Sequence, residues 1–289
     1  MVGAHLNLAI DTIISVHTLA IVMRKLVHIV PLGWEYDRVV LPIASMHAHR
    51  VHLLCKPDSD PVRSHYLDMV KTFLKKRRIE FEHHDVDANS DLRGLLKEMS
   101  DIVQSEQRAH NTVMINIAGA GKVAAAASML VAMAHLSTHT GLLYYPVADD
   151  YSRTEKDRTE HGLSIGMAGE AEEIPYFRLP IPQGDSRVVL WALSNAPGGK
   201  LSYTECIELL KGRGVDGYET PKKPRSGERG APRNMANVTL NRRVVKKLLE
   251  LKFVEVEAEG SERALRLTDQ GRHMAMLCTF GVSIAPGKA

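Results

Sequence analysis

The sequence predicts an α/β protein of two domains: a parallel sheet covered by helices, followed by a smaller domain of helices and a β-hairpin. The chain has 289 residues, 44% of them hydrophobic, which is enough for two buried cores. In the first half, short apolar runs alternate with segments of helical periodicity. In the last third, three helical segments precede two short strands around Gly260.

Five strands are expected in the first half, because each segment is short, rich in β-branched or aromatic residues and followed by a turn signal. They cover residues 25–31, 51–55, 79–86, 112–117 and 141–147. Helices are expected between them at 38–47, 61–78, about 91–109 and 122–137. Such alternation specifies a parallel sheet covered on both faces, so residues 23–148 are interpreted as a Rossmann-like ligand-binding domain. Residues 149–185 are polar and irregular, and are interpreted as a sheet edge and a linker.

Residues 186–282 are predicted to form the second domain. Helices are expected at 187–195, at 203–211, from about 235 or 237 to 251, and at 269–279, with strands at 253–257 and 264–267. Ser202 and Glu205 have the spacing of a capping box, and Thr268 is placed to cap the final helix. This order of elements resembles the winged helix-turn-helix family, most clearly in the runs LNRRVVKKLLELKFVEV and RALRLTDQGR between Leu240 and Arg272.

Charge is divided unevenly between the two halves. Residues 1–185 carry 19 Lys and Arg against 23 Asp and Glu, a net charge of −4, whereas residues 186–289 carry 18 against 11, a net charge of +7. A basic domain joined to an acidic one indicates that only the C-terminal half faces a polyanion such as DNA. A solvated basic surface is the alternative reading of the same composition.

The resemblance implies that the helix at about 237–251 is a recognition helix, which lies in the major groove with its exposed face on base edges and phosphates. Its apolar side is predicted to consist of Val238, Leu240, Val244, Val245, Leu248 and Leu249. The predicted DNA-binding residues are Asn237, Thr239, Asn241, Arg242, Arg243, Lys246 and Lys247 on the helix, Arg225, Arg229 and Arg233 in a basic arm before it, and Arg263 in the wing. The alternatives are a solvated helix face, a disordered loop in place of the arm, and a winged helix that binds a protein partner.

The turn Asn116–Lys122 joins the fourth strand to a helix. Its glycines let the backbone approach a ligand closely, and the helix N-terminus with Lys122 favours an anion. The spacing is neither that of a Walker A loop nor GxGxxG, and Val123 stands where a metal-binding hydroxyl would be needed. The residues alone leave open a phosphate site or a plain strand–helix turn.

A parallel-sheet domain with such a turn, fused to a C-terminal winged helix, resembles the CARF-domain transcriptional regulators of archaea, which are associated with CRISPR systems. The resemblance covers about residues 25–280. Ala118 and Ala120 depart from the family's strand-four motif, where a hydroxyl residue and a second adjacent Gly are common. The resemblance implies a homodimer that binds cyclic oligoadenylates or related nucleotides through the loops after strands one and four. The implied ligand-binding residues are Gly33, Trp34, Tyr36, Asp37, Arg38, Asn116, Ala118, Gly119, Ala120, Gly121 and Lys122.

These features together predict a ligand-responsive DNA-binding transcriptional regulator and not an enzyme. The alternative is a ring nuclease or nucleotide hydrolase that uses the winged helix for dimerisation or docking, with Lys122 or Ser128 carrying the activity. The sequence contains no nucleophile elbow, Ser/His/Asp set or paired-carboxylate motif. No cofactor or metal is expected from the histidines at 47, 49 and 52, at 83 and 84, and at 135 and 139. The last pair has i, i+4 spacing but lacks the glutamate of an HExxH motif, and the first three straddle a helix end and a strand.

Residues 1–22 are interpreted as a short N-terminal extension or the product of an upstream start codon. The apolar run Leu6–Met23 is interrupted by polar residues, and its positive charges follow it, so it fits neither a spanning helix nor a signal peptide. A membrane-associated helix is the alternative. Three widely spaced cysteines, Cys55, Cys206 and Cys278, predict a reducing cytoplasmic compartment.

Overall fold

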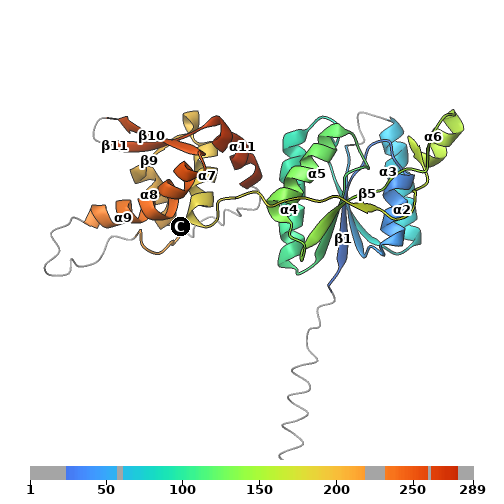
Figure 1. Ribbon diagram of the computed structural model, residues 1–289, viewed down its shortest axis with the longest axis horizontal. Coiled ribbons are helices and arrows are strands. Elements are labelled where there is room, and N and C mark those ends of the chain that lie inside the picture. The colour runs from blue at the N-terminus through green and yellow to red at the C-terminus, as the bar shows by residue number, and fades with distance from the viewer. Residues whose placement is uncertain (1–23, 57–60, 219–231, 260–261, 279–289) are drawn as a thin grey trace, which may run out of the picture.

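The computed structural model describes residues 24–56, 61–218, 232–259 and 262–278. Figure 1 shows two bodies side by side, a parallel-sheet domain and a winged-helix domain, joined by an extended segment. The expected fold class is confirmed. The expectations for residues 1–22 and for Arg225 and Arg229 lie outside the described ranges. Within those ranges, no helix is both long and apolar enough to span a membrane.

The sheet of the first domain has the strand order β3-β2-β1-β4-β5-β8. Its parallel strands are β1 (Leu26–Pro31), β2 (Arg50–Leu54), β3 (Glu80–His84), β4 (Thr112–Asn116) and β5 (Gly141–Tyr145), each close to its predicted position. β8 (Glu172–Glu173) adds an antiparallel edge beside β5. The chain winds outward from β1 to β3 and then crosses back to β4, so the winding direction changes between β1 and β4. Sheets of this type bind ligands outside the carboxyl ends of the strands at that point.

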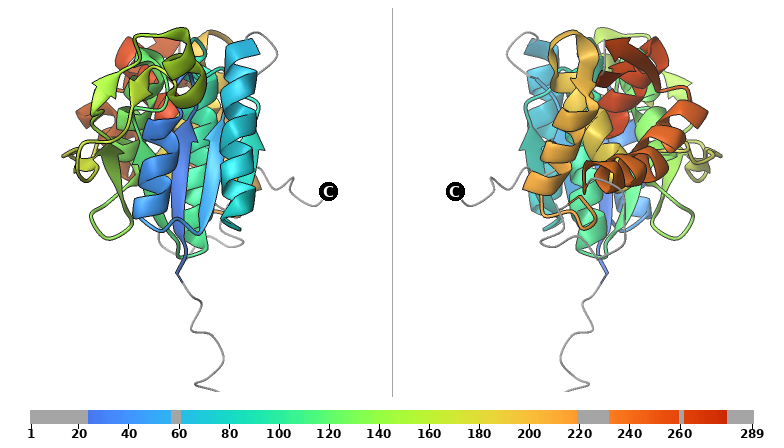
Figure 2. Two further views of the ribbon diagram at one scale, coloured as in Figure 1. Left: turned by 90° about the vertical axis from the view of Figure 1, so that its right-hand side faces the viewer. Right: turned by 90° about the vertical axis from the view of Figure 1, so that its left-hand side faces the viewer.

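Two pairs of helices cover the sheet. α2 (Asp37–Ser45) and α3 (Pro61–Lys76) lie on one face, and α4 (Leu92–Arg108) and α5 (Lys122–His135) lie on the other (Figures 1 and 2). Each pair closes its own apolar core, one around Val30 and Leu53 and the other around Ile29 and Leu95. Successive strand residues point to opposite faces, which is why neighbouring residues of β1 belong to different cores.

The connection between the domains contains more structure than expected. The sequence predicts a sheet edge and a linker for residues 149–185, and β8 supplies an edge strand, but the segment also forms α6 (Glu155–His161) and a strand pair of β6 (Asp150–Tyr151) and β7 (Ser164–Ile165). Thr154 starts α6 through a capping box, because its hydroxyl accepts from Asp157 N at 3.1 Å and the Asp157 carboxylate accepts from Thr154 N at 3.1 Å. α6 is short and buries no residue, so its sequence shows no helical pattern of apolar residues.

The helices of the winged-helix domain are α7 (Asp185–Asn195), the short turn η2 (Pro197–Gly199), α8 (Tyr203–Gly212), α9 (Pro232–Leu240), η3 (Asn241–Val245), α10 (Lys246–Glu250) and α11 (Asp269–Cys278). Its sheet has the order β10-β11-β9, with β10 (Val254–Glu259), β11 (Glu262–Leu267) and β9 (Lys200–Ser202). Only the hairpin was predicted, because three residues of β9 are too few to show alternation. The capping box of α8 is confirmed, since Glu205 N donates to Ser202 Oγ at 3.2 Å and Ser202 N donates to Glu205 Oε2 at 2.7 Å.

The predicted recognition helix is continuous from α9 through the π-helical turn η3 to α10, because the backbone stays helical at both junctions. Leu240, Val244, Val245 and Leu248 are buried, as predicted. Val238 and Leu249 are 64% and 40% exposed, so their assignment to the apolar side is wrong. A helix turns by about 100° per residue, which places Val238 on the side opposite Leu240 and turns Leu249 away from Leu248.

The last helix connects the two domains. α11 packs against α4 and α5, and Met274 contacts the cores of both domains. Leu277 is buried in the core that α4 and α5 close. A further contact is the hydrogen bond from Arg187 Nη2 of α7 to Gln104 Oε1 of α4 at 3.2 Å. The winged helix is therefore seated on the α4–α5 face of the sheet domain.

We expect Leu248→Ala to destabilise the winged-helix domain by about 2–5 kcal/mol, because it leaves a cavity in a closed core. Leu249→Ala is the matched control on the next residue, and we expect it to cost less than about 1 kcal/mol, because that side chain is largely outside the core. Urea unfolding followed by circular dichroism measures both. Equal losses for the two variants would contradict the orientation of the helix.

Candidate functional site

The loops after β1 and β4 touch each other at the carboxyl edge of the sheet. Gly33 N donates to Gly119 O at 2.7 Å. A Cβ atom on Gly119 would lie 2.4 Å from Pro31 O, so only glycine allows this approach. The structure thus brings together the two predicted ligand loops, with backbone against backbone and no side chain between them.

Three of the predicted ligand-binding residues, Asp37, Arg38 and Asn116, are buried and bonded within the chain. Asn116 Nδ2 donates to Arg38 O at 2.9 Å, and its Oδ1 accepts from Ala118 N at 2.8 Å. Asp37 Oδ2 accepts from Gly166 N at 2.8 Å and lies 2.8 Å from His161 Nδ1. These side chains hold the two loops in place, an internal role that the sequence did not indicate.

Arg38 is the basic member of this buried group. Its Nε donates to Pro146 O at 2.8 Å, and its guanidinium lies 4.5 Å from the centre of the Tyr145 ring. Its Nη1 lies 3.5 Å from the Glu35 carboxylate, which also accepts from Ser164. Burial raises the pKa of Glu35, and the bonds from Ser164 and the charge of Arg38 oppose that rise. Among the buried side-chain nitrogens of the described residues, Arg38 Nη2 is one that lacks a hydrogen-bond partner.

Other members of the predicted set remain accessible. Trp34 is 45% exposed, and Gly121 and Lys122 are exposed at the start of α5. Gly121 is the first residue before the helix, and its N–H lies 3.3 Å from Asn89 Oδ1. The described residues offer Lys122 no hydrogen bond or ion pair. Gly33, Ala118 and Gly119 are buried beneath these groups, and Tyr36 and Ala120 are partly buried. An anion could therefore reach this edge at Gly121 and Lys122.

A cavity of about 370 Å³ adjoins the strand-one loop on the side of Trp34. Its lining residues come from that loop, from the start of α3 and from α6: Trp34, Pro61, Val62, His65, Tyr66, Glu155, Arg158, Thr159 and Leu163. Tyr66 Oη donates to Arg158 O, and His65 Nε2 lies 3.1 Å from Thr159 O, so α6 is held against α3. Aromatic and apolar walls with a few polar groups suit a planar ring. Sequence reasoning missed this cavity because it missed α6, although the Thr154–Asp157 capping box signals that helix.

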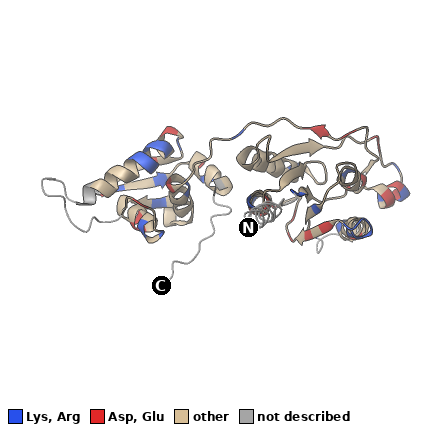
Figure 3. Ribbon diagram, turned by 90° about the horizontal axis from the view of Figure 1, so that it is seen from below, with Lys and Arg blue, Asp and Glu red and all other residues tan. Residues whose placement is uncertain are grey.

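The exposed side of α9–η3–α10 carries Arg242, Lys246 and Lys247. Figure 3 shows Lys and Arg gathered on the second half of this helix. The same side exposes Met235, Val238 and Leu249, and a shallow groove of about 530 Å³ runs between Val238 and Glu250. The helix thus offers a mixed basic and apolar surface.

Other predicted DNA-binding residues are partly engaged within the domain. Arg243 Nη1 donates to Asp216 O at 2.8 Å and lies 3.6 Å from the Asp185 carboxylate. Asn241 Nδ2 donates to Asn237 O at 2.9 Å, and Tyr203 Oη donates to Asn241 Oδ1 at 3.4 Å. Thr239 lies near Gly217. Arg233 belongs to the first turn of α9. The most exposed of the predicted helix charges are therefore Arg242, Lys246 and Lys247, of which Lys246 lies 3.9 Å from Glu250 Oε1.

The wing has mixed charge. Arg263 is exposed and close enough to Tyr203 to interact with its hydroxyl. Glu257 pairs with Lys200 at 2.9 Å and with Arg266 at 3.0 Å, and these bonds lower its pKa. Glu255 and Glu262 are exposed. The hairpin is therefore a weaker partner for phosphates than the helix.

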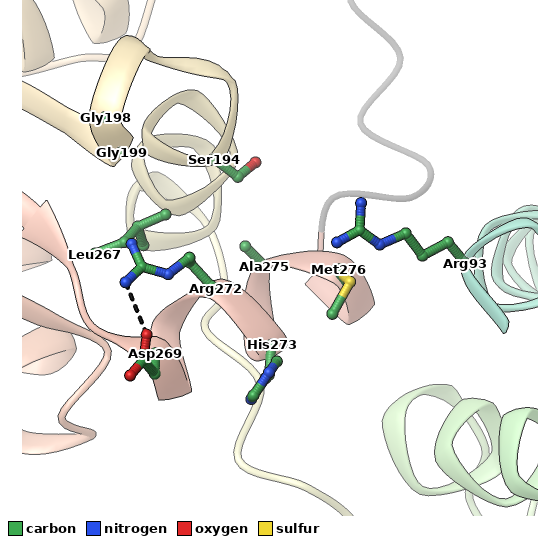
Figure 4. Close-up of a pocket in the computed structure, with 10 residues that line it drawn as sticks. All are labelled: Arg93, Ser194, Gly198, Gly199, Leu267, Asp269, Arg272, His273, Ala275 and Met276. Carbon is green, nitrogen blue, oxygen red and sulfur yellow. Dashed lines mark hydrogen bonds and ion pairs between the residues drawn. The ribbon is translucent and has the colours of Figure 1, made fainter.

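A second cavity, of about 710 Å³, lies between the two domains. It is lined by Arg93, Ser194, Gly198, Gly199, Leu267, Asp269, Arg272, His273, Ala275 and Met276. Figure 4 shows Arg93 reaching from α4 towards Met276, while Arg272 is paired with Asp269 at 2.7 Å. The domains thus touch through α11 and are separated beside it, which leaves room for them to shift against each other.

Comparison with known families supports both domains. A family model described as "HFX_2341_N:-like, N-terminal" matches residues 26–151, and one described as "DUF6293 C-terminal winged helix domain" matches residues 185–279. No curated protein matches the chain. The second match independently describes the C-terminal domain as a winged helix.

Several solved structures are similar to most of the chain. They include Can2 from Sulfobacillus thermosulfidooxidans in complex with cyclic tetra-adenylate (14% identity, 86% of this chain and 63% of that one, TM-score 0.34) and protein VC1899 from Vibrio cholerae (12%, 87% and 65%, 0.36). Enterococcus italicus Csm6 bound to cyclic hexa-2'-fluoro-hexa-dAMP is a third (12%, 79% and 56%, 0.38). The chain spans less than two thirds of the length of each. Identities and scores this low transfer no property to this chain.

We expect Asn116→Ala to loosen the carboxyl edge, because it leaves the Arg38 carbonyl and the Ala118 N–H buried without partners, at about 1–3 kcal/mol each. Asn89→Ala is the control at the same edge, since it removes one long hydrogen bond from a partly exposed side chain. Amide hydrogen exchange of peptides covering residues 33–38 and 117–121 should accelerate in the first variant only. Unchanged exchange in Asn116→Ala would show that other contacts hold the loops.

Proposed function

We propose that this chain is a DNA-binding transcriptional regulator whose sheet domain senses an anionic nucleotide, with cyclic oligoadenylates as the first ligands to test. The observation that carries the proposal is the α9–η3–α10 helix. One side of it closes the core of the winged-helix domain, and the other exposes Arg242, Lys246 and Lys247. In a domain of net charge +7, such a helix suits the major groove.

Spacing on the helix supports this reading. Arg242 and Lys246 are four residues apart, so they lie one turn from each other on the same side. Arg242 is positioned to reach a guanine edge or a phosphate, and Lys246 to neutralise the next phosphate. Tyr203 of α8 contacts Asn241 of the helix and Arg263 of the wing, and we propose that helix and wing straddle one strand of DNA at this point.

The carboxyl edge of the sheet supports the ligand class. A phosphate fits at Gly121 and Lys122, where helix N–H groups and one ammonium group point outward. A nucleobase fits in the neighbouring cavity, against Trp34 and Tyr66. The loop that begins at Gly33 supplies Trp34 to the cavity and contacts the turn that precedes Lys122, so we propose that the two places bind parts of one nucleotide.

A route from ligand to DNA runs through α5. This helix begins at Lys122, and it packs against α11, which belongs to the winged-helix domain. A ligand that prefers one position of α5 would therefore favour one position of the winged helix, in proportion to its difference in affinity for the two. We further propose a homodimer, with two winged helices on operator half-sites about one helical turn, or a multiple of it, apart.

Two alternatives keep some support. Met235, Val238 and Leu249 on the exposed side of the helix favour a winged helix that binds a protein. A ring nuclease retains Lys122 as its reactive group, but Ser128 is fully buried on α5 and cannot reach a ligand at the edge. Archaeal origin and a link to CRISPR systems stay predictions.

For the DNA site, we expect Arg242→Ala and Lys246→Ala each to weaken binding to the DNA upstream of the protein's own gene. Each change should also reduce the slope of log K against log salt by about one, because one phosphate contact is lost. Lys75→Ala, an exposed lysine of α3, is the control and should change neither quantity. Fluorescence anisotropy at several salt concentrations measures both. Wild-type affinity in both helix variants would favour the protein-binding alternative, which Val238→Ser would then test.

For the ligand site, we expect Lys122→Ala to lower affinity for cyclic tetra-adenylate by about 10-fold or more, since a hydrogen bond to a charged group contributes about 1.5–3 kcal/mol. Lys97→Ala on α4 is the charge-matched control. Isothermal titration measures the affinities, and chromatography of the same mixtures detects cleavage. A wild-type protein whose Tm no cyclic or linear oligoadenylate raises would rule out this ligand class. Turnover that disappears in Lys122→Ala would favour the nuclease.

A further inference from the structure

A cluster of two histidines and a glutamate lies on β2 and β3, away from the loops at the end of β1 and β4. The two strands pair in parallel with His52 opposite Glu82, and His84 follows two residues later on the same face. His52 Nδ1 lies 2.9 Å from His84 Nε2 and 3.8 Å from Glu82 Oε2. One ligand atom from each of the three residues falls within 4.8 Å of the others.

Two further carboxylates, both on α4, determine where the protons of the imidazoles lie. Glu106 Oε1 is 2.9 Å from His52 Nε2, and Glu98 Oε1 is 2.6 Å from His84 Nδ1. An ionised carboxylate only accepts hydrogen bonds, so these two nitrogens carry the protons of the neutral rings. The remaining nitrogens, His52 Nδ1 and His84 Nε2, then face each other with their lone pairs at 2.9 Å. Such an arrangement is repulsive unless a cation lies between them.

We propose that His52, Glu82 and His84 bind one divalent transition-metal ion of the zinc class. Zinc takes imidazole nitrogens at about 2.0–2.1 Å in tetrahedral geometry, which separates two such nitrogens by about 3.3 Å. The distance of 2.9 Å between His52 Nδ1 and His84 Nε2 would have to increase by only a few tenths of an ångström. Three protein ligands leave a fourth position, which water fills.

The surroundings fit a metal ion better than a shared proton. Metal-bound imidazoles regularly donate their other N–H to a carboxylate, as both rings do here. His52 is buried and hydrogen-bonded to Glu106, so its ring is held in one orientation. Glu82, Glu98 and Glu106 supply three negative charges, and Arg50 balances one of them through Glu106 at 2.9 Å. Glu82 is 58% exposed, which gives an ion access from solvent.

Bound there, the ion joins β3, an edge strand of the sheet, to β2, and through Glu98 and Glu106 it joins both strands to α4. The test uses the full chain without an affinity tag, stripped of metal by a chelator. Competition with a chromophoric chelator measures the affinity for Zn²⁺, and Co²⁺ substitution reports the coordination geometry from its visible absorption bands. We expect one equivalent to bind, with the strong visible bands of four- or five-coordinate cobalt and a rise in Tm.

His84→Ala should weaken Zn²⁺ binding at least about 100-fold, and Glu82→Gln at least about tenfold. Glu98→Gln should weaken it about 10- to 100-fold, because it removes the group that orients His84. His139→Ala and Asp85→Asn, an exposed histidine and an exposed carboxylate outside the cluster, should bind as the wild type does.

The absence of a Zn²⁺ equivalent tighter than surface binding would overturn the proposal, as would unchanged affinity in both Glu82→Gln and Glu98→Gln. Those two glutamate side chains are partly or largely exposed, so their replacement leaves the fold intact and decides the question even where His84→Ala fails to fold.

Discussion

The contact between the strand-one and strand-four loops is the constraint on which the candidate ligand site depends. Gly33 N and Gly119 O are 2.7 Å apart, and Gly119 leaves no space for a side chain beside Pro31. A ligand therefore lies above this contact, against exposed groups such as Trp34 and Lys122. Buried polar bonds beneath it, through Asn116, fix the edge before any ligand arrives. Such preorganisation reduces the ordering that binding would otherwise require.

On the α4 side of the sheet, hydrogen bonds keep a buried carboxylate ionised. Burial alone would raise the pKa of Glu106, but hydrogen bonds from Asn111, His52 and Arg50 outweigh it and hold that pKa below its usual value. The carboxylate thus stays ionised in a low-dielectric interior, where each of its bonds is strong. The hydrogen bond between His52 Nε2 and this carboxylate, at 2.9 Å, fixes the rotamer of His52. The position of its free nitrogen is consequently a property of the fold and not of a mobile surface side chain.

Most strands and helices could be predicted from the sequence, because the spacing of apolar residues within one segment indicates whether that segment is a strand or a helix. It could not show which residues meet across the sheet. His52 was grouped with His47 and His49, its neighbours along the chain, although strand pairing places it beside Glu82 and His84. The same limit affected the predicted ligand loop: Asp37 and Arg38 look like exposed loop charges in the sequence, yet Asp37 is bonded to His161 and Gly166, and Arg38 to Pro146. The exposure of one residue on the α9–η3–α10 helix depends on which side of the helix faces the core. An exposed apolar residue such as Val238 blurs that side in the sequence pattern.

α4 contacts the histidine cluster, the core beneath α5 and the winged-helix domain. Its residues Glu98 and Glu106 face the histidine cluster, Leu95 and Met99 fill the core under α5, and Gln104 bonds the winged-helix domain. A helix moves nearly as a rigid body, because its side chains are packed too tightly to yield one at a time. α5 packs against α11 and α4, and α4 also packs against α11, so a shift of α5 caused by a ligand at Lys122 would be transmitted to α11 both directly and through α4. Anchoring α4 to β2 and β3 would restrict the second route, so the histidine cluster and a ligand at Lys122 would act on the winged-helix domain through the same pair of helices.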